Sequence, residues 1–479
     1  MFKSILHLCM CLLFVSLLLT GNAFSQDVPV SGELNKKIAS ADLLSDLDFI
    51  LARISDKQFN RTPFNFIPEN DFQKEVKTIK DYLAKHDSLT RLDFLLSAGP
   101  LVASLKDDHA SFKVGGSKWM QNTLKGGLTQ EKFFIPMSAI LYDGQAYVVA
   151  SDTIPLKSQI ISINDVPVMD VLGKTLKCVD YSIYSCIDRK LVTFFDFGKY
   201  AFELYTMFHF NNEITVKYIP YGQTKEEVVV MPLYRYMDKT ALAKAKIIPI
   251  KMEKAPSLTF RDDIAILRIP SFQLGRNMGE ALKQYLGLFD KYFKEIDAKK
   301  SKKLLIDLSN NGGGSEYPGY ILLNYLTDKK LKVTYNSDDT TPAELFNQSI
   351  RKEIGDSVAN QYQFSLFKGD VYLLTSELTF SAAARFGDVF KTNSLGKIIG
   401  RETRGFRTHY GEAKWYDLEK TGLGLQLSSK FLVSASGDMQ PHGVTPDMEI
   451  KYKNIDDACD RFGNDYLLTE AVKYISAAN

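Results

Sequence analysis

Apolar residues recur at three- and four-residue steps near the start of the chain. Residues 41–55, 71–86 and 91–105 show this spacing, and polar breaks separate them. The spacing places the apolar side chains on one face of a helix. Ser88 and Thr90, in the second break, are typical N-cap residues. We therefore predict an N-terminal helical domain over residues 26–120.

The pattern changes to short β-type runs from about residue 133. Residues 133–151, 158–172 and 213–233 are rich in β-branched and aromatic residues, with Gly, Asn and Asp turns between them. This predicts a small β-rich module over residues 121–245. The stretch "IISINDVPVMDV" resembles the strand–turn–strand segment of PDZ domains, and another small β-barrel is the alternative.

Strands and helices alternate from residue 262 onward. Apolar runs in "DIAILRIPSF", "KKLLIDLS" and "DVYLLTS" are each followed by a helical pattern. Repeated strand–helix units predict an α/β core with parallel strand pairing over residues 246–479. A closing helix over residues 456–477 could pack on the outside or against a second subunit, so a homo-oligomer is one expectation.

The N-terminus resembles a leader for export. One lysine precedes an apolar run over residues 5–19, and Ala23, Phe24 and Ser25 fit the small-x-small rule for signal peptidase. We expect a signal peptide over residues 1–25 and a periplasmic or extracellular protein that does not span the membrane after cleavage. An uncleaved anchor is the alternative, although the run is short for a membrane span.

Charge and cysteine usage exclude several classes of protein. The 59 basic and 57 acidic residues nearly cancel, so we expect no nucleic-acid partner. Removal of the leader would leave Cys178, Cys186 and Cys459, which match neither a disulfide framework nor a metal-site spacing. Cys178 and Cys186 could pair or could be separate buried thiols. We expect neither a metal nor a cofactor.

A serine lies where a strand leads into a helix. In "VYLLTSELTFSAAARFGDVFK", residues 371–391, the first part reads as a buried strand and the second as a helix, which places Ser381 at the junction. A serine there can accept a hydrogen bond from a free backbone N–H as an N-cap. The same N–H groups and the helix dipole favour a nucleophile that develops an oxyanion. We predict both roles for Ser381.

Three successive glycines follow the preceding predicted strand. Gly312, Gly313 and Gly314 allow a tight turn whose backbone approaches a ligand closely. The turn could be a phosphate cradle, an oxyanion hole or a loose loop, although no Lys-Ser/Thr pair and no G-x-G-x-x-G pattern accompany it. Loops at the carboxyl ends of parallel strands converge. The glycine turn and Ser381 are therefore expected to face each other.

A serine nucleophile requires a base. His109, in "SLKDDHASF", follows a helix and has two acidic neighbours, Asp107 and Asp108. We predict that His109 is the base. His442 is the rival candidate, and His409 could line the same cleft. A surface histidine beside carboxylates is the alternative for His109.

Four motifs together resemble peptidase family S41, which contains the tail-specific or C-terminal processing proteases. They are "LLIDLSNNGGG", "TSELTFSAAA", "IIGRETRG" and "HGVTPDMEI", in the family's order, over residues 304–450. The resemblance implies a ClpP/crotonase-like protease core of βαβ units, joined to the helical domain and the PDZ-like module in an α/β multidomain chain. The segment "DDHASF" resembles the one that carries the base in the tricorn-like branch.

The resemblance also implies roles for individual residues. Phe406 stands where one branch of the family has a lysine base, and Arg407 cannot replace that lysine because guanidinium keeps its proton. The Ser–His design of the tricorn-like branch therefore fits, with Ser381 as nucleophile and His109 as base.

The third catalytic position departs from the family pattern. Gln440 stands where the tricorn-like branch has a glutamate, and Asp438 and Glu402 are the carboxylates nearby. The loss of the third residue lowers the rate without changing the reaction type. The expected oxyanion donors are the backbone N–H of Ala382 and one from Gly313 or Gly314. The residues expected to contact substrate are Gly312, Thr379 and Phe380.

These features predict an exported serine endopeptidase. Peptide or protein substrates would form an acyl-enzyme on Ser381, and the PDZ-like module would present the substrate's tail. One alternative is a non-catalytic protein of the same fold that binds a peptide or a lipid. Another is a crotonase-like enzyme that acts on a thioester, although export argues against acyl-CoA chemistry.

Overall fold

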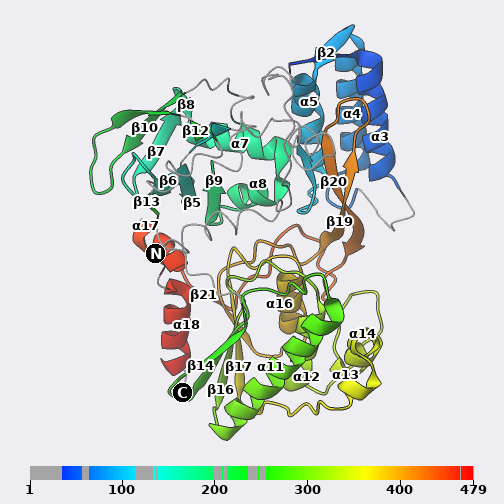
Figure 1. Cartoon of the computed structure of the whole chain (residues 1–479), viewed down its shortest axis with the longest axis vertical. Helices are drawn as coiled ribbons and strands as arrows, with labels where there is room; N and C mark the ends of the chain where they lie inside the picture. Colours follow the sequence, from blue (N-terminus) through cyan, green and yellow to red (C-terminus); the bar gives the residue numbers. More distant parts are fainter. Residues whose placement is uncertain are drawn as a thin grey trace, which may run out of the picture. The chain divides into compact units, whose positions relative to one another are not determined.

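A computed structural model describes most of the chain. The described residues are 35–56, 64–113, 133–135, 137–197, 204, 208, 213–232, 234–235, 246–247, 255–463 and 465–477. The predicted signal peptide lies outside these residues. The chain divides into two compact units, and each is described by itself (Figure 1). Unit 1 comprises Met1–Ile250, Glu412–Lys430 and Asn454–Gly463; unit 2 comprises Lys251–Gly411, Phe431–Lys453 and Asn464–Asn479.

The predicted N-terminal helices are present in unit 1. They are α3 (Ser40–Ile54), α4 (Glu69–Ala84) and α5 (Arg91–Ser104). Thr90 caps α5 as predicted, because its hydroxyl accepts a hydrogen bond from the backbone N–H of Asp93, whose carboxylate bonds back to the Thr90 N–H. The prediction for Ser88 was wrong: Ser88 lies in β2 (Ser88–Thr90), which pairs with β1 (Lys37–Ala39).

Unit 1 also contains a mainly antiparallel sheet, which we call the β module. Its main path runs β11-β10-β7-β6-β5-β9, with β13 paired to β6 and β8 to β7. The strands are β5 (Met137–Tyr142), β6 (Gln145–Ser151), β7 (Gln159–Ile163), β8 (Val166–Pro167), β9 (Thr193–Asp196), β10 (Glu213–Ile219), β11 (Glu227–Pro232) and β13 (Lys246–Ile247). A separate pair joins β4 (Phe133–Phe134) to β12 (Tyr234–Arg235).

Two helices belong to the β module, α7 (Val168–Val179) and α8 (Tyr181–Asp188). Cys178 and Cys186, on these helices, are buried free thiols, so the second of the two alternatives for this pair is correct. Burial raises the pKa of the Cys178 thiol to about 11. These cysteines are therefore packing residues.

The predicted parallel sheet forms the centre of unit 2. Its order is β14-β15-β16-β17-β18-β21. The strands are β14 (Ser257–Arg261), β15 (Ile264–Arg268), β16 (Lys303–Asp307), β17 (Asp370–Thr375), β18 (Lys397–Gly400) and β21 (Met448–Glu449). The strands β15 to β21 pair in parallel, and only β14 is antiparallel to its neighbour. The carboxyl ends of β16 and β17 therefore lie at the same edge, where the glycine turn and Ser381 follow.

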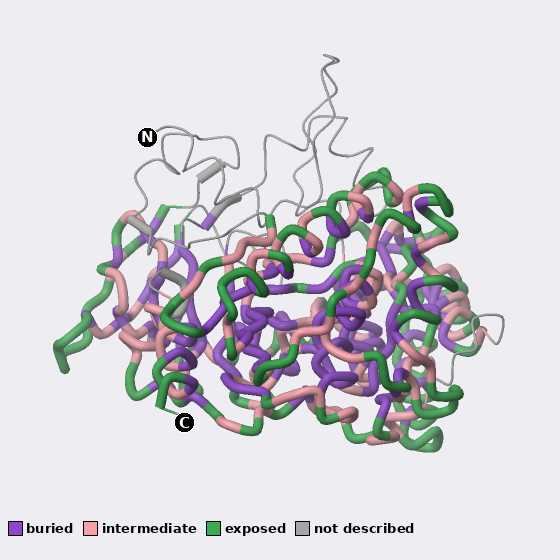
Figure 2. The backbone as a smooth tube through the Cα atoms, turned by 90° about the horizontal axis from the view of Figure 1, so that it is seen from below, coloured by how far each residue is buried: buried purple, intermediate pink, exposed green. Residues whose placement is uncertain are grey.

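Helices pack on this sheet and bury its apolar residues (Figures 1 and 2). The helices of unit 2 are α11 (Met278–Ala298), α12 (Tyr317–Leu326), α13 (Pro342–Leu345), η3 (Phe346–Ile350), α14 (Arg351–Ile354), α15 (Asp356–Ala359), α16 (Ala382–Thr392) and α18 (Tyr466–Ala477). The short helices α13, η3 and α14 lie against α11 and α12, and α15 lies against α14. Asn277 caps α11 by accepting a hydrogen bond from the backbone N–H of Glu280. The sheet thus has the layered α/β architecture that the alternation of elements predicted.

Two further segments complete the described structure. In a three-stranded sheet, β20 (Gly424–Leu432) lies between β19 (His409–Asp417) and β3 (Ser111–Lys113). The predicted closing helix is two helices, α17 (Ile455–Gly463) in unit 1 and α18 in unit 2. Within the described part of the chain, no helix combines the length and apolar character needed to cross a membrane.

Candidate active site

Ser381 occupies a strained turn at the start of α16. Its backbone has φ 51° and ψ −126°, a combination that L-residues rarely adopt. Ser381 stands at the N-cap position, but its side chain makes no capping hydrogen bond. The prediction of a capping role was therefore wrong. A strained serine between a strand and a helix is the geometry of a nucleophile elbow.

The glycine turn packs directly against Ser381, as the sequence predicted. Gly313 has φ 93°, and a Cβ atom at this position would lie 2.8 Å from the Cβ of Ser381 and 2.7 Å from the carbonyl oxygen of Phe380. The backbone N–H of Phe380 donates to the carbonyl oxygen of Asn311 at 3.0 Å. Only glycine fits at position 313, because both the positive φ and the close contact exclude a side chain.

Asn311 fixes the conformation of this turn and accepts a hydrogen bond from one backbone N–H of the turn. The Oδ1 atom of Asn311 accepts from the Gly313 N–H at 2.8 Å, and its Nδ2 donates to the Ile269 carbonyl at 3.0 Å. The N–H groups of Gly314 and Ala382 have no acceptor among the described residues. Of the two glycines considered as oxyanion donors, Gly314 therefore fits better than Gly313.

The loop after β18 supports the other side of the serine turn. A Cβ atom on Gly405 would lie 2.8 Å from the backbone nitrogen of Ser381, and the Gly405 N–H donates to the Thr379 carbonyl at 3.2 Å. The guanidinium of Arg404 stacks on the ring of Phe380, 4.3 Å from its centroid. Ser381 is thus held between two glycine-containing loops of unit 2.

The residues predicted to contact substrate differ in their surroundings. Gly312 is exposed and Phe380 is half-buried. Thr379 is buried, and its hydroxyl donates to the Leu308 carbonyl while it accepts from the Ser376 N–H. Thr379 therefore stabilises the turn from inside.

Buried charges anchor the helix that Ser381 precedes. Arg385 is 4% exposed, and its Nε donates to Glu316 Oε1 at 2.7 Å. One turn further, Asp388 accepts from Arg407 Nε at 2.7 Å and from the hydroxyl of Ser434 at 2.8 Å. These contacts connect α16 to neighbouring segments of unit 2.

The pKa of Glu316 is lower than its ordinary value. Burial acts to raise this pKa, but Arg385, the hydroxyl of Tyr320 and the nearby His409 outweigh burial and lower it. The ionised carboxylate therefore contributes stability above its unfolded pKa of about 4.3. This contribution is lost as the pH falls through the lower folded pKa.

Replacing Glu316 by glutamine should destabilise the protein most at neutral pH. Arg385 would lose its charged partner, and because 34% of the Glu316 side chain is exposed, we expect a loss of about 2 kcal/mol, less than for a fully buried pair. Urea unfolding at pH 7 and pH 3.5 measures the difference, which should shrink in acid. Exposed Glu353→Gln is the control, and an equal difference at both pH values would contradict the role of the ion pair.

His109 lies in unit 1 beside an acidic residue. Its Nδ1 is 2.9 Å from Asp108 Oδ1, and the side chains of His109 and Asp108 are 16% and 2% exposed. Asp107 accepts from the backbone N–H of His109 at 3.0 Å and from the N–H and hydroxyl of Ser428. The carbonyl oxygen of His109 accepts from Gln426 Nε2. Asp108 therefore orients the imidazole through its contact with Nδ1.

The candidate third residues lie in unit 2, each with its own partners. Asp438 Oδ2 is 2.9 Å from His442 Nε2 and 3.4 Å from Arg407. Burial acts to raise the pKa of Asp438, but the Gln440 backbone N–H, His442 and Arg407 outweigh it and lower this pKa. Gln440 is exposed, and Glu402 Oε1 accepts from the Gly443 N–H at 2.8 Å.

His442 and His409, in unit 2, each make local contacts. His442, the rival base, also has its Nδ1 2.7 Å from the Gly443 carbonyl oxygen, so both ring nitrogens have partners. His409 is buried, with Nδ1 3.0 Å from the Phe406 carbonyl oxygen.

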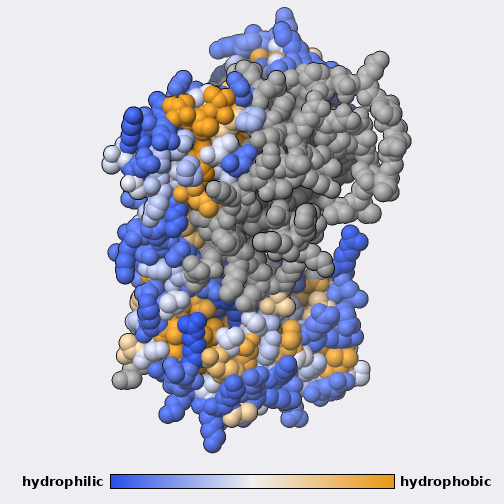
Figure 3. Space-filling view, turned by 60° about the vertical axis from the view of Figure 1, so that its left-hand side comes forward, coloured by the Kyte–Doolittle hydropathy of each residue, from blue (hydrophilic) through white to orange (hydrophobic). Residues whose placement is uncertain are grey.

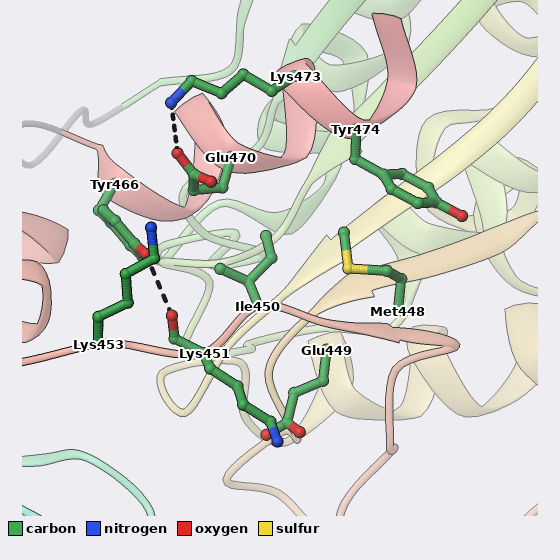
Figure 4. Close-up of a pocket in the computed structure, with 9 residues that line it drawn as sticks. All are labelled: Met448, Glu449, Ile450, Lys451, Lys453, Tyr466, Glu470, Lys473 and Tyr474. Carbon is green, nitrogen blue, oxygen red and sulfur yellow. Dashed lines mark hydrogen bonds and ion pairs between the residues drawn. The ribbon is translucent and has the colours of Figure 1, made fainter. Parts of the chain in front are cut away.

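A surface pocket of about 460 Å³ lies elsewhere in unit 2, between the β21 segment and α18 (Figure 4). Its lining residues are Met448, Glu449, Ile450, Lys451, Lys453, Tyr466, Glu470, Lys473 and Tyr474. Glu470 pairs with Lys473 at 2.6 Å, Glu449 with Arg401 at 2.9 Å, and the Tyr466 hydroxyl donates to the Lys451 carbonyl. None of the predicted site residues lines this pocket.

Three residues that matter for this geometry were missed by reasoning from the sequence. Asn311 and Gly405 received no role, although an asparagine before a glycine turn is a known signal for a side-chain-stabilised turn. Asp108 was recognised only as an acidic neighbour of His109. Its contact with Nδ1 depends on the backbone conformation, which residue order alone does not specify.

Part of the chain is similar to a known peptidase family. The model of peptidase family S41 matches residues 263–450. The tail-specific protease of Haemophilus influenzae is 28% identical over 216 residues, which are 43% of this chain and 28% of that protein. The chain thus covers little more than a quarter of that relative.

Solved structures show the same fold at low sequence identity. Mature CPAF complexed with lactacystin has a TM-score of 0.55 and 17% identity, over 91% of this chain and 98% of that one. A CPAF mutant has a TM-score of 0.56 and 16% identity, over 89% and 96%. The mixed α/β multidomain fold is therefore that of S41 proteases. With the matched motifs, the family model and this fold, residues 263–450 are assigned to a domain of the peptidase family S41 type.

Proposed function

We propose that the chain is a serine endopeptidase that cleaves peptide bonds through an acyl-enzyme on Ser381. The observation that carries this proposal is the strained Ser381 turn packed against Gly313. Strain of this kind persists where it has a function. The turn also leaves the N–H groups of Gly314 and Ala382 beside the serine, where they can stabilise an oxyanion.

In the proposed reaction, Ser381 Oγ attacks the carbonyl carbon of the scissile bond. His109 Nε2 takes the serine proton and then gives it to the leaving amine, which releases the first product. Water, activated by the same imidazole, cleaves the ester and restores Ser381. His109 belongs to unit 1 and Ser381 to unit 2, so the proposal requires that they meet during catalysis.

We assign the role of orienting the base to Asp108. It contacts His109 Nδ1 directly, and a carboxylate there stabilises the imidazolium that forms in the transition state. Glu402, Asp438 and Gln440 remain candidates for a further contribution. The hydrogen bonds of Asp438 to His442 and of Glu402 to Gly443 support structural roles for these two residues.

The finer predictions from the sequence remain part of this proposal. They are the ClpP/crotonase-like description of residues 246–479, the helical domain over residues 26–120, the PDZ-like module over residues 121–245 that presents a substrate tail, and export by a signal peptide over residues 1–25. The alternation of parallel strands with helices in unit 2 supports the first of these.

A fluorophosphonate probe tests the nucleophile and the base together. The purified protein should be labelled at Ser381, and both Ser381→Ala and His109→Ala should lose the label while they remain folded by circular dichroism. If His109→Ala were labelled as well as the wild type, His109 would be excluded as the base. A folded wild type that stays unlabelled would replace the proposal with a peptide-binding protein of the same fold.

Replacing Asp108 by asparagine should lower kcat by about 100-fold and leave KM nearly unchanged. The amide can still contact Nδ1, but it stabilises the imidazolium less than the carboxylate does. Steady-state kinetics on a fluorogenic peptide measure the effect, and Asp108→Glu should recover part of the rate. If kcat were unchanged, or if KM rose by the same factor by which kcat fell, Asp108 would only support the fold.

A further inference from the structure

The edge strand β11 breaks the usual alternation of an exposed sheet face. On its neighbour β10, Ile214 and Val216 are buried, and the outward residues Thr215 and Lys217 are polar. On β11, the outward residues Val228 and Val230 are 61% and 52% exposed. Val229 and Met231 face the core, so four successive positions are apolar. Antiparallel sheets normally place polar residues on the solvent face.

The open edge of β11 contrasts with the other edge of the same sheet. Among the described residues, β11 pairs only with β10. At the opposite edge, β9 is four residues long, and its residues Thr193 and Phe195 are buried. Figure 3 shows hydrophobic surface among hydrophilic residues on the side of the molecule that carries β10. An exposed edge whose central residues, 228–231, are all apolar is a site for pairing with another strand.

The residues of β11 are complementary to themselves. In an antiparallel pair of two copies centred on Val229, Val228 of one copy lies opposite Val230 of the other. By symmetry, Val230 of the first copy lies opposite Val228 of the second. The exposed valines then cover each other. A pair centred on Val228 would place Val230 opposite Glu226, and one centred on Val230 would place Val228 opposite Pro232. Each of these registers leaves one exposed valine of each copy without a valine opposite it.

We infer that β11 pairs with β11 of a second copy of this chain, antiparallel and centred on Val229. The main-chain N–H and C=O groups of the two edges provide the hydrogen bonds, and the four exposed valines provide the apolar contact. Glu226 and Glu227 of the two copies lie at opposite ends of the paired strands, so like charges do not meet. An interface of one strand pair is small, so the dimer is weak and concentration-dependent.

Sedimentation velocity tests the dimer with the full chain. The wild type should shift from monomer to dimer as its concentration rises to about 0.1 mM. Val228→Lys combined with Val230→Lys places like charges opposite each other and should raise Kd at least about tenfold. Met278→Lys makes the same change at a residue 40% exposed on α11 and should leave Kd unchanged.

Single cysteines test the register. Under mild oxidation, Val229→Cys should form a disulfide-linked dimer, and Val228→Cys and Val230→Cys should not, because only position 229 meets its own copy. A wild type that stays monomeric, or crosslinking that is strongest at position 228 or 230, would overturn the inference. A third outcome would identify substrate as the occupant of the β11 edge instead. In that outcome the wild type is monomeric, and the double lysine variant cleaves an unfolded protein more slowly than the wild type but a short peptide equally fast.

Discussion

Replacing Ser381 by glycine is expected to abolish activity and to make the protein more stable. Loss of the nucleophile should lower kcat by about 10⁶-fold, as expected when the central residue of a catalytic group is removed. The backbone of Ser381, at φ 51° and ψ −126°, is a conformation that glycine adopts without strain. Relief of this strain should raise the free energy of unfolding by about 1 kcal/mol.

Ser381→Ala is the matched control for this trade-off. Alanine also removes the hydroxyl, but it keeps a Cβ atom and therefore the strain. Kinetics on a peptide substrate should give the same loss for both variants, and urea unfolding should place only the glycine variant above the wild type. Equal stability of the two variants would show that the turn stores no strain. Wild-type activity in either variant would exclude Ser381 as the nucleophile.

Periodicity alone predicted most of the regular elements. The spacing of apolar residues indicated α3, α4 and α5 close to their observed bounds, and the helical patterns after the predicted strands of unit 2 indicated α11 and α16. The alternation of strands and helices indicated the parallel sheet of unit 2. Burial of one helix face or of a whole strand depends on local pattern, and that pattern is visible in the sequence. The break between α17 and α18 was missed.

The details of the site depended on contacts that residue order does not specify. Ser381 looked like an N-cap, because serine between a strand and a helix usually is one; its positive φ is set by packing against Gly313 and Gly405. The choice between Gly313 and Gly314 required the hydrogen bond from Gly313 to Asn311. The role of Thr379 required knowledge of its burial. The motifs located the site, and packing assigned the individual roles.

Replacing Gly313 by alanine should disable the site without touching Ser381 chemically. The new Cβ would lie 2.8 Å from the Cβ of Ser381 and 3.0 Å from the Ala382 nitrogen, so the serine turn and an oxyanion donor must move. We expect kcat to fall by at least about 100-fold, because misplacement near 1 Å is costly. The strained φ and the clash should also lower the free energy of unfolding by about 3 kcal/mol.

Gly312→Ala provides the matched control one residue earlier. Gly312 is exposed, and a Cβ atom there meets nothing within 4 Å. Its stability and its rate of fluorophosphonate labelling should therefore stay close to the wild type. Labelling rates and urea unfolding of both variants separate the loss of activity from the loss of stability in Gly313→Ala. If Gly313→Ala labelled as fast as the wild type, the glycine turn would not position the nucleophile, and an oxyanion hole between Gly314 and Ala382 would be excluded.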